Sequence, residues 1–124
     1  MKKTFLSFFL FFVAYLSYAT TGGPYPMDYN ASIDDDEAKV IVYSSPFYSG
    51  GSLWIKNQET NESYFIQSSS TYYAQWFYVI PRGIYIITSI ANGYSVQTQG
   101  STRSVYDTID FTSGGGYIML IPNY

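Results

Sequence analysis

Residues that could carry acid–base or nucleophilic chemistry are few in this chain. The sequence contains no histidine and no cysteine, so the commonest general base, the thiolate nucleophile and the usual zinc ligands are all missing. Carboxylate pairs remain, and two carboxylates that flank one substrate are the machinery of glycosidases. A catalytic site of this kind therefore requires two carboxylates that can reach the same substrate.

Two carboxylate pairs deserve that test, and neither predicts a catalytic site. Asp107 and Asp110 are three residues apart in a predicted strand, which sends their side chains to opposite faces of a sheet. Glu59 and Glu62 flank a predicted turn, where acidic side chains are solvated. We therefore expect no catalytic residues, no cofactor and no enzyme activity.

A run of four acids, Asp34 to Glu37, raises the question of a calcium site. Calcium loops place their ligands at alternate positions around a glycine, so that the ligands converge on one point. Four consecutive acids are expected to point in different directions, and no glycine follows them here. The run instead predicts a solvated segment that keeps the edge of the first strand soluble, with no metal.

The first residues have the pattern of a secretory signal peptide. Two lysines, an apolar run over 5–16 and the small residues Ser17 and Ala19 predict a leader over 1–19 and a mature chain that begins at Thr20. An uncleaved membrane anchor is the alternative. Because the chain has no cysteine, a lipid anchor and disulfides are excluded. We expect a secreted or periplasmic protein of bacterial type.

About 105 residues follow the predicted leader, enough for one domain. Residues 20–37 carry glycines, prolines and acids without an apolar period, which predicts a flexible acidic leader; residues 38–124 form the domain. The full chain has a net charge of −3, and removal of two N-terminal lysines would make it more acidic. Nucleic acid is therefore excluded as an expected partner.

From residue 38 onward the apolar period is two, and Val, Ile, Tyr, Phe, Trp and Thr dominate, as in β-strands. Glycine, proline and asparagine separate short segments of this kind, and no stretch predicts a helix. The sequence thus predicts an all-β fold, a single antiparallel β-sandwich. About eight short strands are expected, at 38–44, 52–57, 63–67, 72–80, 83–90, 94–99, 105–111 and 116–121.

Two segments resemble a known group of proteins. Trp76 to Tyr85 (WFYVIPRGIY) contains a strand, a Pro-x-Gly turn and a Gly-x-Tyr strand, and Ile109 to Ile118 (IDFTSGGGYI) leads from an aromatic strand end through glycines into a second Tyr-containing strand. Both are similar to small bacterial exported β-sandwich domains of unknown function, and remotely to PEGA and carboxypeptidase-regulatory-like domains. The resemblance implies an immunoglobulin-like or transthyretin-like sandwich and carries no catalytic residues.

The turn at Pro81 and Gly83 has a physical reading of its own. Proline presets φ and cannot donate to a ladder, while glycine tolerates positive φ or a close backbone approach. Tyr85 follows two residues later, where its ring can lie in the core while the hydroxyl reaches a backbone carbonyl. We expect a structural role for Tyr85.

Both faces of the segments 72–80 and 83–90 are largely apolar, whereas a two-layer sandwich leaves one face to water. We expect Trp76, Tyr78 and Ile80 to face the core, which puts Tyr73 and Phe77 outside.

In the segment 52–57 we expect Leu53 and Ile55 inside and Trp54 and Lys56 outside. The candidate ligand-binding residues are therefore an outward stripe of Trp54, Tyr73 and Phe77. Such a stripe is typical of a protein interface or of a platform on which sugar rings stack. The same side chains could instead lie under loops of the domain itself.

These expectations define the function predicted from the sequence. The chain is expected to act in the cell envelope or outside the cell by non-covalent binding, with an envelope or extracellular protein, or a second copy of itself, as the partner. A carbohydrate-binding module is the alternative.

Overall fold

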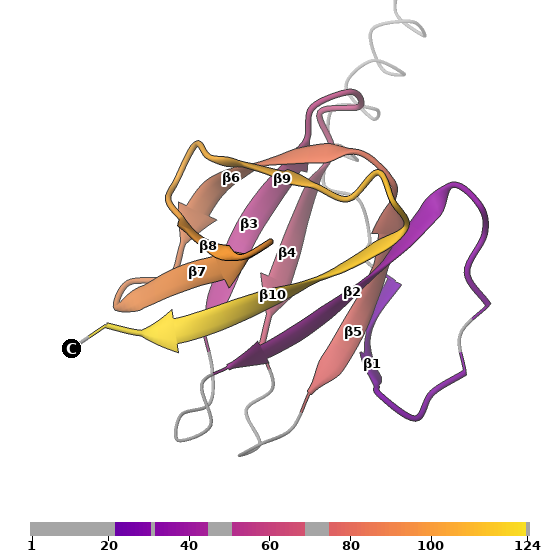
Figure 1. Ribbon diagram of the computed structural model, residues 1–124, viewed down its shortest axis with the longest axis horizontal. Helices are drawn as coiled ribbons and strands as arrows, with labels where there is room; N and C mark the ends of the chain where they lie inside the picture. Colours follow the sequence, from indigo (N-terminus) through magenta and orange to yellow (C-terminus); the bar gives the residue numbers. More distant parts are fainter. Residues whose placement is uncertain (1–21, 31, 45–50, 69–74, 124) are drawn as a thin grey trace, which may run out of the picture.

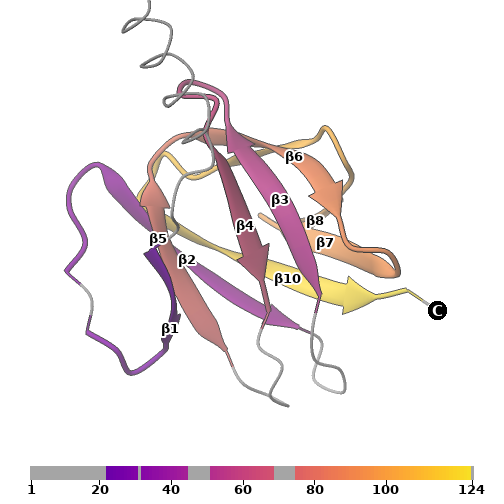
Figure 2. The same ribbon diagram turned by 180° about the vertical axis from the view of Figure 1, so that it is seen from behind.

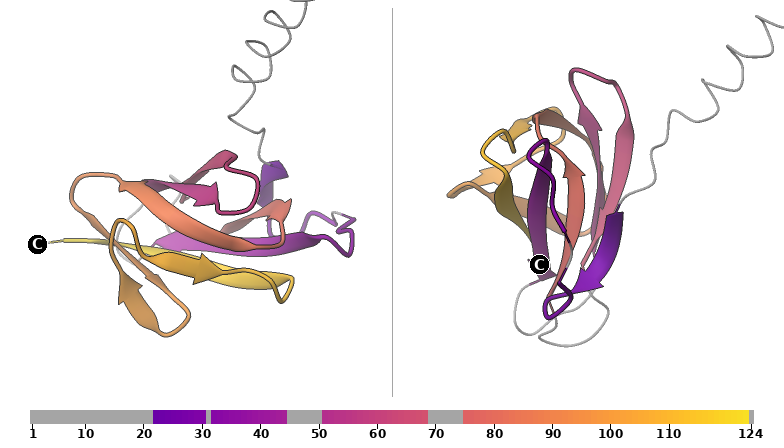
Figure 3. Two further views of the ribbon diagram at one scale, coloured as in Figure 1. Left: turned by 90° about the horizontal axis from the view of Figure 1, so that it is seen from above. Right: turned by 90° about the vertical axis from the view of Figure 1, so that its right-hand side faces the viewer.

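The computed structural model describes residues 22–30, 32–44, 51–68 and 75–123. Within these ranges the chain is all-β, without a helix, and its strands form two sheets that pack face to face as a sandwich (Figures 1 and 3). The fold class predicted from the period-two pattern is thus confirmed as a sandwich-like all-β domain.

Ten strands are present in the described residues, two more than predicted. They are β1 (Gly22–Pro26), β2 (Glu37–Ser44), β3 (Ser52–Asn57), β4 (Ser63–Gln67), β5 (Trp76–Pro81), β6 (Ile84–Ile90), β7 (Tyr94–Thr98), β8 (Ser101–Arg103), β9 (Thr108–Asp110) and β10 (Gly115–Pro122).

One sheet has six strands in the order β1-β5-β2-β10-β7-β8, and the other has four in the order β4-β3-β6-β9 (Figure 2). All the observed strand pairs are antiparallel except one, since β2 runs parallel to β10 from the pair Lys39 and Gly115 to the pair Ser44 and Leu120. The expected antiparallel sandwich therefore has a parallel pair at the centre of its larger sheet, because the first long strand and the last lie side by side there.

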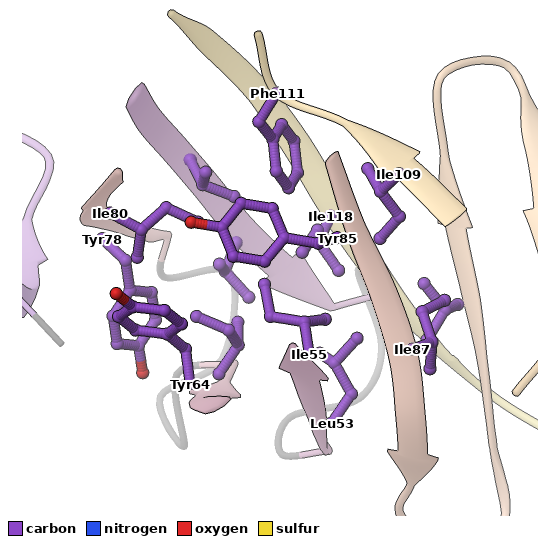
Figure 4. Close-up of a cluster of buried hydrophobic side chains, with 14 of the residues drawn as sticks. Leu53, Ile55, Tyr64, Tyr78, Ile80, Tyr85, Ile87, Ile109, Phe111 and Ile118 are labelled. Carbon is purple, nitrogen blue, oxygen red and sulfur yellow. The ribbon is translucent and has the colours of Figure 1, made fainter. Parts of the chain in front are cut away.

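The core lies between the sheets and takes aliphatic and aromatic side chains from both (Figure 4). Tyr85 is fully buried between Phe111 and Tyr64, with ring centroids 6.0 Å and 5.9 Å away. Leu53 and Ile55 point inward as predicted. Aromatic pairs at these distances stabilise a core beyond the area they bury.

The turn between β5 and β6 confirms the expected role of Tyr85. Its hydroxyl donates a hydrogen bond to the Pro81 carbonyl at 2.5 Å while its ring is buried. A Cβ atom on Gly83 would lie 2.9 Å from Nδ2 of Asn57, so a close approach requires glycine at this position. The Asn57 side chain is itself buried and accepts hydrogen bonds from two backbone N–H groups of the following turn.

Two predictions of chain organisation are corrected. The flexible leader predicted over 20–37 contains β1, which pairs with β5 through Tyr25 opposite Phe77. The sequence did not predict β8 either, because a three-residue strand of Ser, Thr and Arg has no apolar alternation. Both extra strands lie at the edges of the six-stranded sheet.

The strand predicted over 105–111 is reduced to residues 108–110. The preceding residues form a turn in which the Ser104 N–H donates to the Asp107 carboxylate at 2.7 Å and the Asp107 N–H donates to the Ser104 carbonyl at 3.0 Å. Inside that turn Tyr106 has a φ of 76°, which no strand residue adopts.

Candidate functional site

Trp54 lies where the sequence predicts it, on the outer face of the four-stranded sheet. It is partly buried, and its ring packs against that of Phe65, with centroids 5.1 Å apart at an angle of 49°. The two residues are direct cross-strand partners in β3 and β4. We call Trp54 and Phe65 the outer aromatic pair.

Two isoleucines of β6 lie on the same outer face as the outer aromatic pair. Ile84 is 43% exposed and Phe65 is 38% exposed, while Ile86 lies on the same face opposite Lys56 of β3. The outer face is therefore mixed. Its apolar side chains have polar cross-strand partners, since Trp54 lies opposite Ser89 and Ile84 lies opposite Asp110.

Phe77 contradicts its prediction as an exposed binding residue. Its side chain points away from the core cluster, as expected, but is only 1% exposed. The Tyr25 ring of β1 lies 5.4 Å away, and the Lys39 ammonium lies 4.4 Å from the ring centroid. The unpredicted strand β1 accounts for this burial, because it adds a neighbour beside β5. Tyr73 lies outside the described residues.

Trp76, Tyr78 and Ile80 face inward as predicted, and two of them also tie the sheets together. Nε1 of Trp76 donates to the Gln67 carbonyl at 2.6 Å, and the Tyr78 hydroxyl accepts from the Gln67 N–H at 3.2 Å. Side chains of β5 thereby satisfy the end of β4, a strand of the opposite sheet.

Three exposed aromatic features were missed by the sequence reasoning. Phe65 could have been found, because Tyr64 and Ile66 are inward neighbours in an alternating strand. Tyr106 is 76% exposed at the tip of a turn that interrupts a strand-like pattern, so no sequence signal marks it. Tyr29, 51% exposed, stacks on Tyr25 with ring centroids 4.7 Å apart at an angle of 14°.

The outer face of the six-stranded sheet also carries tyrosines. Tyr43 and Tyr117 are partly buried, and their ring centroids lie 6.0 Å apart. Burial raises the pKa of Tyr43, and the neighbouring Tyr117 phenol adds to that effect. The shift favours the neutral phenol and creates no acid or base suited to neutral pH.

The carboxylate pairs are separated into local structures. Asp110 accepts hydrogen bonds from both the N–H and the hydroxyl of Thr112, which hold its pKa below the usual value. Asp107 lies in its own turn rather than on a strand. Glu62 accepts the Tyr64 hydroxyl at 2.9 Å, so the expectation that this acid is simply solvated is wrong. Asp107, Asp110 and Glu62 each hydrogen-bond to a residue two or three positions away in the chain.

The acidic run has a different geometry from the one predicted. Carboxylate oxygens of Asp34, Asp36 and Glu37 lie within 4.8 Å of one another, because a turn brings the Glu37 N–H to within 3.0 Å of the Asp34 carbonyl. The expectation that these acids diverge is therefore wrong. The side chains are exposed or half-buried, which is ordinary for acids at a turn and does not by itself make a cation site.

Among the described residues, no helix is long and apolar enough to cross a membrane. No protein-family model, no curated protein and no solved structure matches this chain.

Proposed function

We propose that this chain is an exported, non-catalytic domain that binds a protein of the cell envelope or of the extracellular space. The observation that carries the proposal is a group of partly exposed apolar side chains on the outer face of the four-stranded sheet, the outer aromatic pair with Ile84 and Ile86. Exposed aromatic and aliphatic side chains gathered on one face are typical of protein interfaces.

Export is supported by the N-terminal sequence. The basic start, the apolar run over 5–16 and the small residues Ser17 and Ala19 have the order of a signal peptide that is removed before Thr20. Export also agrees with a surface that has little charge, since charged residues make up 12% of the chain. We place the mature protein in the periplasm or outside the cell.

For the fold type, we propose the transthyretin-like alternative. In immunoglobulin domains the second and third strands belong to different sheets. Counted from β2, the second and third strands here are β3 and β4, which form a hairpin in one sheet. This pairing favours the transthyretin-like arrangement and suits a domain that displays binding surfaces on rigid sheets.

Carbohydrate binding is the second candidate, and it now depends on a different aromatic. Phe77 is buried and the rings of the outer aromatic pair are tilted, so the predicted stripe makes no flat platform. The nearly parallel stack of Tyr29 on Tyr25, with Tyr29 51% exposed, is the feature that favours this alternative.

Affinity capture tests the proposal. The mature chain, immobilised, should retain a defined protein from an envelope fraction, and Trp54→Ala should abolish that retention. Tyr106→Ala is the matched control, because Tyr106 is an aromatic residue, 76% exposed, at a different place. Equal retention by both variants would contradict the proposed face. Retention on a polysaccharide column that Tyr29→Ala removes would favour the carbohydrate alternative.

A further inference from the structure

Among the described residues, four strands lie at the edges of the two sheets, and they differ in how their edges are protected. They are β1 and β8 in the six-stranded sheet and β4 and β9 in the four-stranded sheet. An edge strand presents unpaired N–H and C=O groups to any extended chain that approaches, so proteins shorten, charge or cover such edges.

Three of these edges carry a recognisable protection. Pro24 and Pro26 remove N–H groups from β1. The strands β8 and β9 have only three residues each. In addition, the Gln99 side-chain amide donates to the Asp110 carbonyl and accepts from the Asp110 N–H, so that it occupies the edge of β9 as a neighbouring strand would.

The edge of β4 lacks proline, charge and glycine over its five residues. The Asn57 N–H donates to the Glu62 carbonyl, and the Ser68 N–H donates to the Gly51 carbonyl. These two bonds show which residues of β4 direct their backbone groups toward β3. Since bonded residues alternate along an antiparallel strand, Tyr64 and Ile66 bond to β3. The N–H and C=O groups of Ser63, Phe65 and Gln67 therefore point away from the sheet.

Part of this edge is already occupied. The Tyr78 hydroxyl and the Trp76 indole hydrogen-bond to the backbone of Gln67. Within the part of the chain that the structure describes, Ser63 and Phe65 have no such cap, so β4 keeps two outward-facing residues at the spacing i and i+2. By the same alternation β8 keeps one, Thr102, and β9 keeps one, Thr108.

We propose that β4 pairs antiparallel with β4 of a second copy of this chain, about a two-fold axis at Tyr64. In that register Ser63 of each copy lies opposite Phe65 of the other, and the two uncapped residues exchange four backbone hydrogen bonds. The capped residue Gln67 takes no part. The inference rests on the proposed function, protein binding, and names the partner as the chain itself.

Two further features suit a second copy. The two Phe65 rings become diagonal neighbours on the outer face, at a separation that aromatic side chains can bridge, and they join the outer aromatic pairs of both copies into one row. Glu62, the acid next to the strand, lies opposite Ile66 of the other copy, which keeps the two carboxylates apart. An isologous interface requires this self-complementarity.

The contact is short, well under the roughly 1,200 Å² buried by stable interfaces, so we expect a weak and concentration-dependent dimer. Sedimentation velocity of the mature chain should show a monomer at about 10 µM and dimer at about 1 mM, a range in which binding is weak. In the same range the exchange of the Phe65 amide with solvent should slow about fourfold, as the fraction of monomer falls, while that of Thr102 stays constant.

Ser63→Pro removes an N–H that β3 does not use, which an edge strand tolerates, and it should weaken dimerisation at least about tenfold. Thr102→Pro, at the edge of β8, is the matched control and should not weaken it. A parent chain that stays monomeric, or a dimer in which the Phe65 amide exchanges at an unchanged rate, would overturn the inference. The proposed function would still be judged by the effect of Trp54→Ala on capture.

Discussion

Replacing Phe77 by alanine should destabilise the domain far more than replacing Phe65 by alanine, although both rings point away from the core. Phe77 is 1% exposed and Phe65 is 38% exposed. The same atoms are removed in both variants, so the difference in unfolding free energy reports the burial of each ring. The pair tests whether Tyr25, on the neighbouring strand β1, shields the Phe77 ring from water.

The size of the effect follows from what surrounds each ring. A buried Phe→Ala substitution costs about 3–5 kcal/mol. The neighbours that cover Phe77 are the Tyr25 ring at 5.4 Å and the Lys39 ammonium at 4.4 Å, so the vacated space opens near the surface and the cost should be at the lower end, about 3 kcal/mol. Phe65 loses one ring contact and less buried area, for about 1 kcal/mol.

Equilibrium unfolding in urea measures both values. With a slope of about 1.5 kcal/mol per molar, the Phe77→Ala midpoint should fall by about 2 M and the Phe65→Ala midpoint by less than about 1 M. Midpoints that fall equally would refute the burial of Phe77 between the side chains of Tyr25 and Lys39. A larger loss for Phe65→Ala would show that the outer aromatic pair contributes more to stability than this structure implies.

Three further outcomes are expected. Burial raises the pKa of three core phenols above 10.0 in the folded state, so their contribution to stability should be constant below about pH 10 and should be lost as pH rises above it. Urea midpoints at pH values from neutral to above 10 check this, and an unchanged midpoint would contradict it. These phenols belong to Tyr64, Tyr78 and Tyr85. Asn57→Ala should lower the free energy of unfolding by about 1–3 kcal/mol, because two backbone N–H groups lose their acceptor. Thermal unfolding measures this loss, with Gln58→Ala, at an exposed neighbouring position, as the control. Equal melting temperatures of the two variants would refute the prediction. Mass spectrometry of exported protein should find Thr20 as the first residue, and an intact leader would contradict the signal peptide.

Much of the fold could be predicted because its signals are local. Alternating apolar residues place Leu53 and Ile55 inside β3, and this alternation depends only on the geometry of an extended chain. The Pro81 turn, its glycine and the buried Tyr85 hydroxyl are likewise encoded within a few residues. The absence of histidine and cysteine limits the chemistry of the chain whatever its fold.

Tertiary structure decided what covers each outward side chain, and therefore where a binding surface is available. Alternation predicts that Phe77 points outward, but β1 arrives from a distant part of the sequence and buries it. Burial depends on such long-range neighbours, whereas period and turn chemistry do not. For the same reason, only the tertiary structure shows which part of the β4 edge is available for pairing. Side chains of β5, a strand of the other sheet, hydrogen-bond to Gln67 and so occupy one end of that edge.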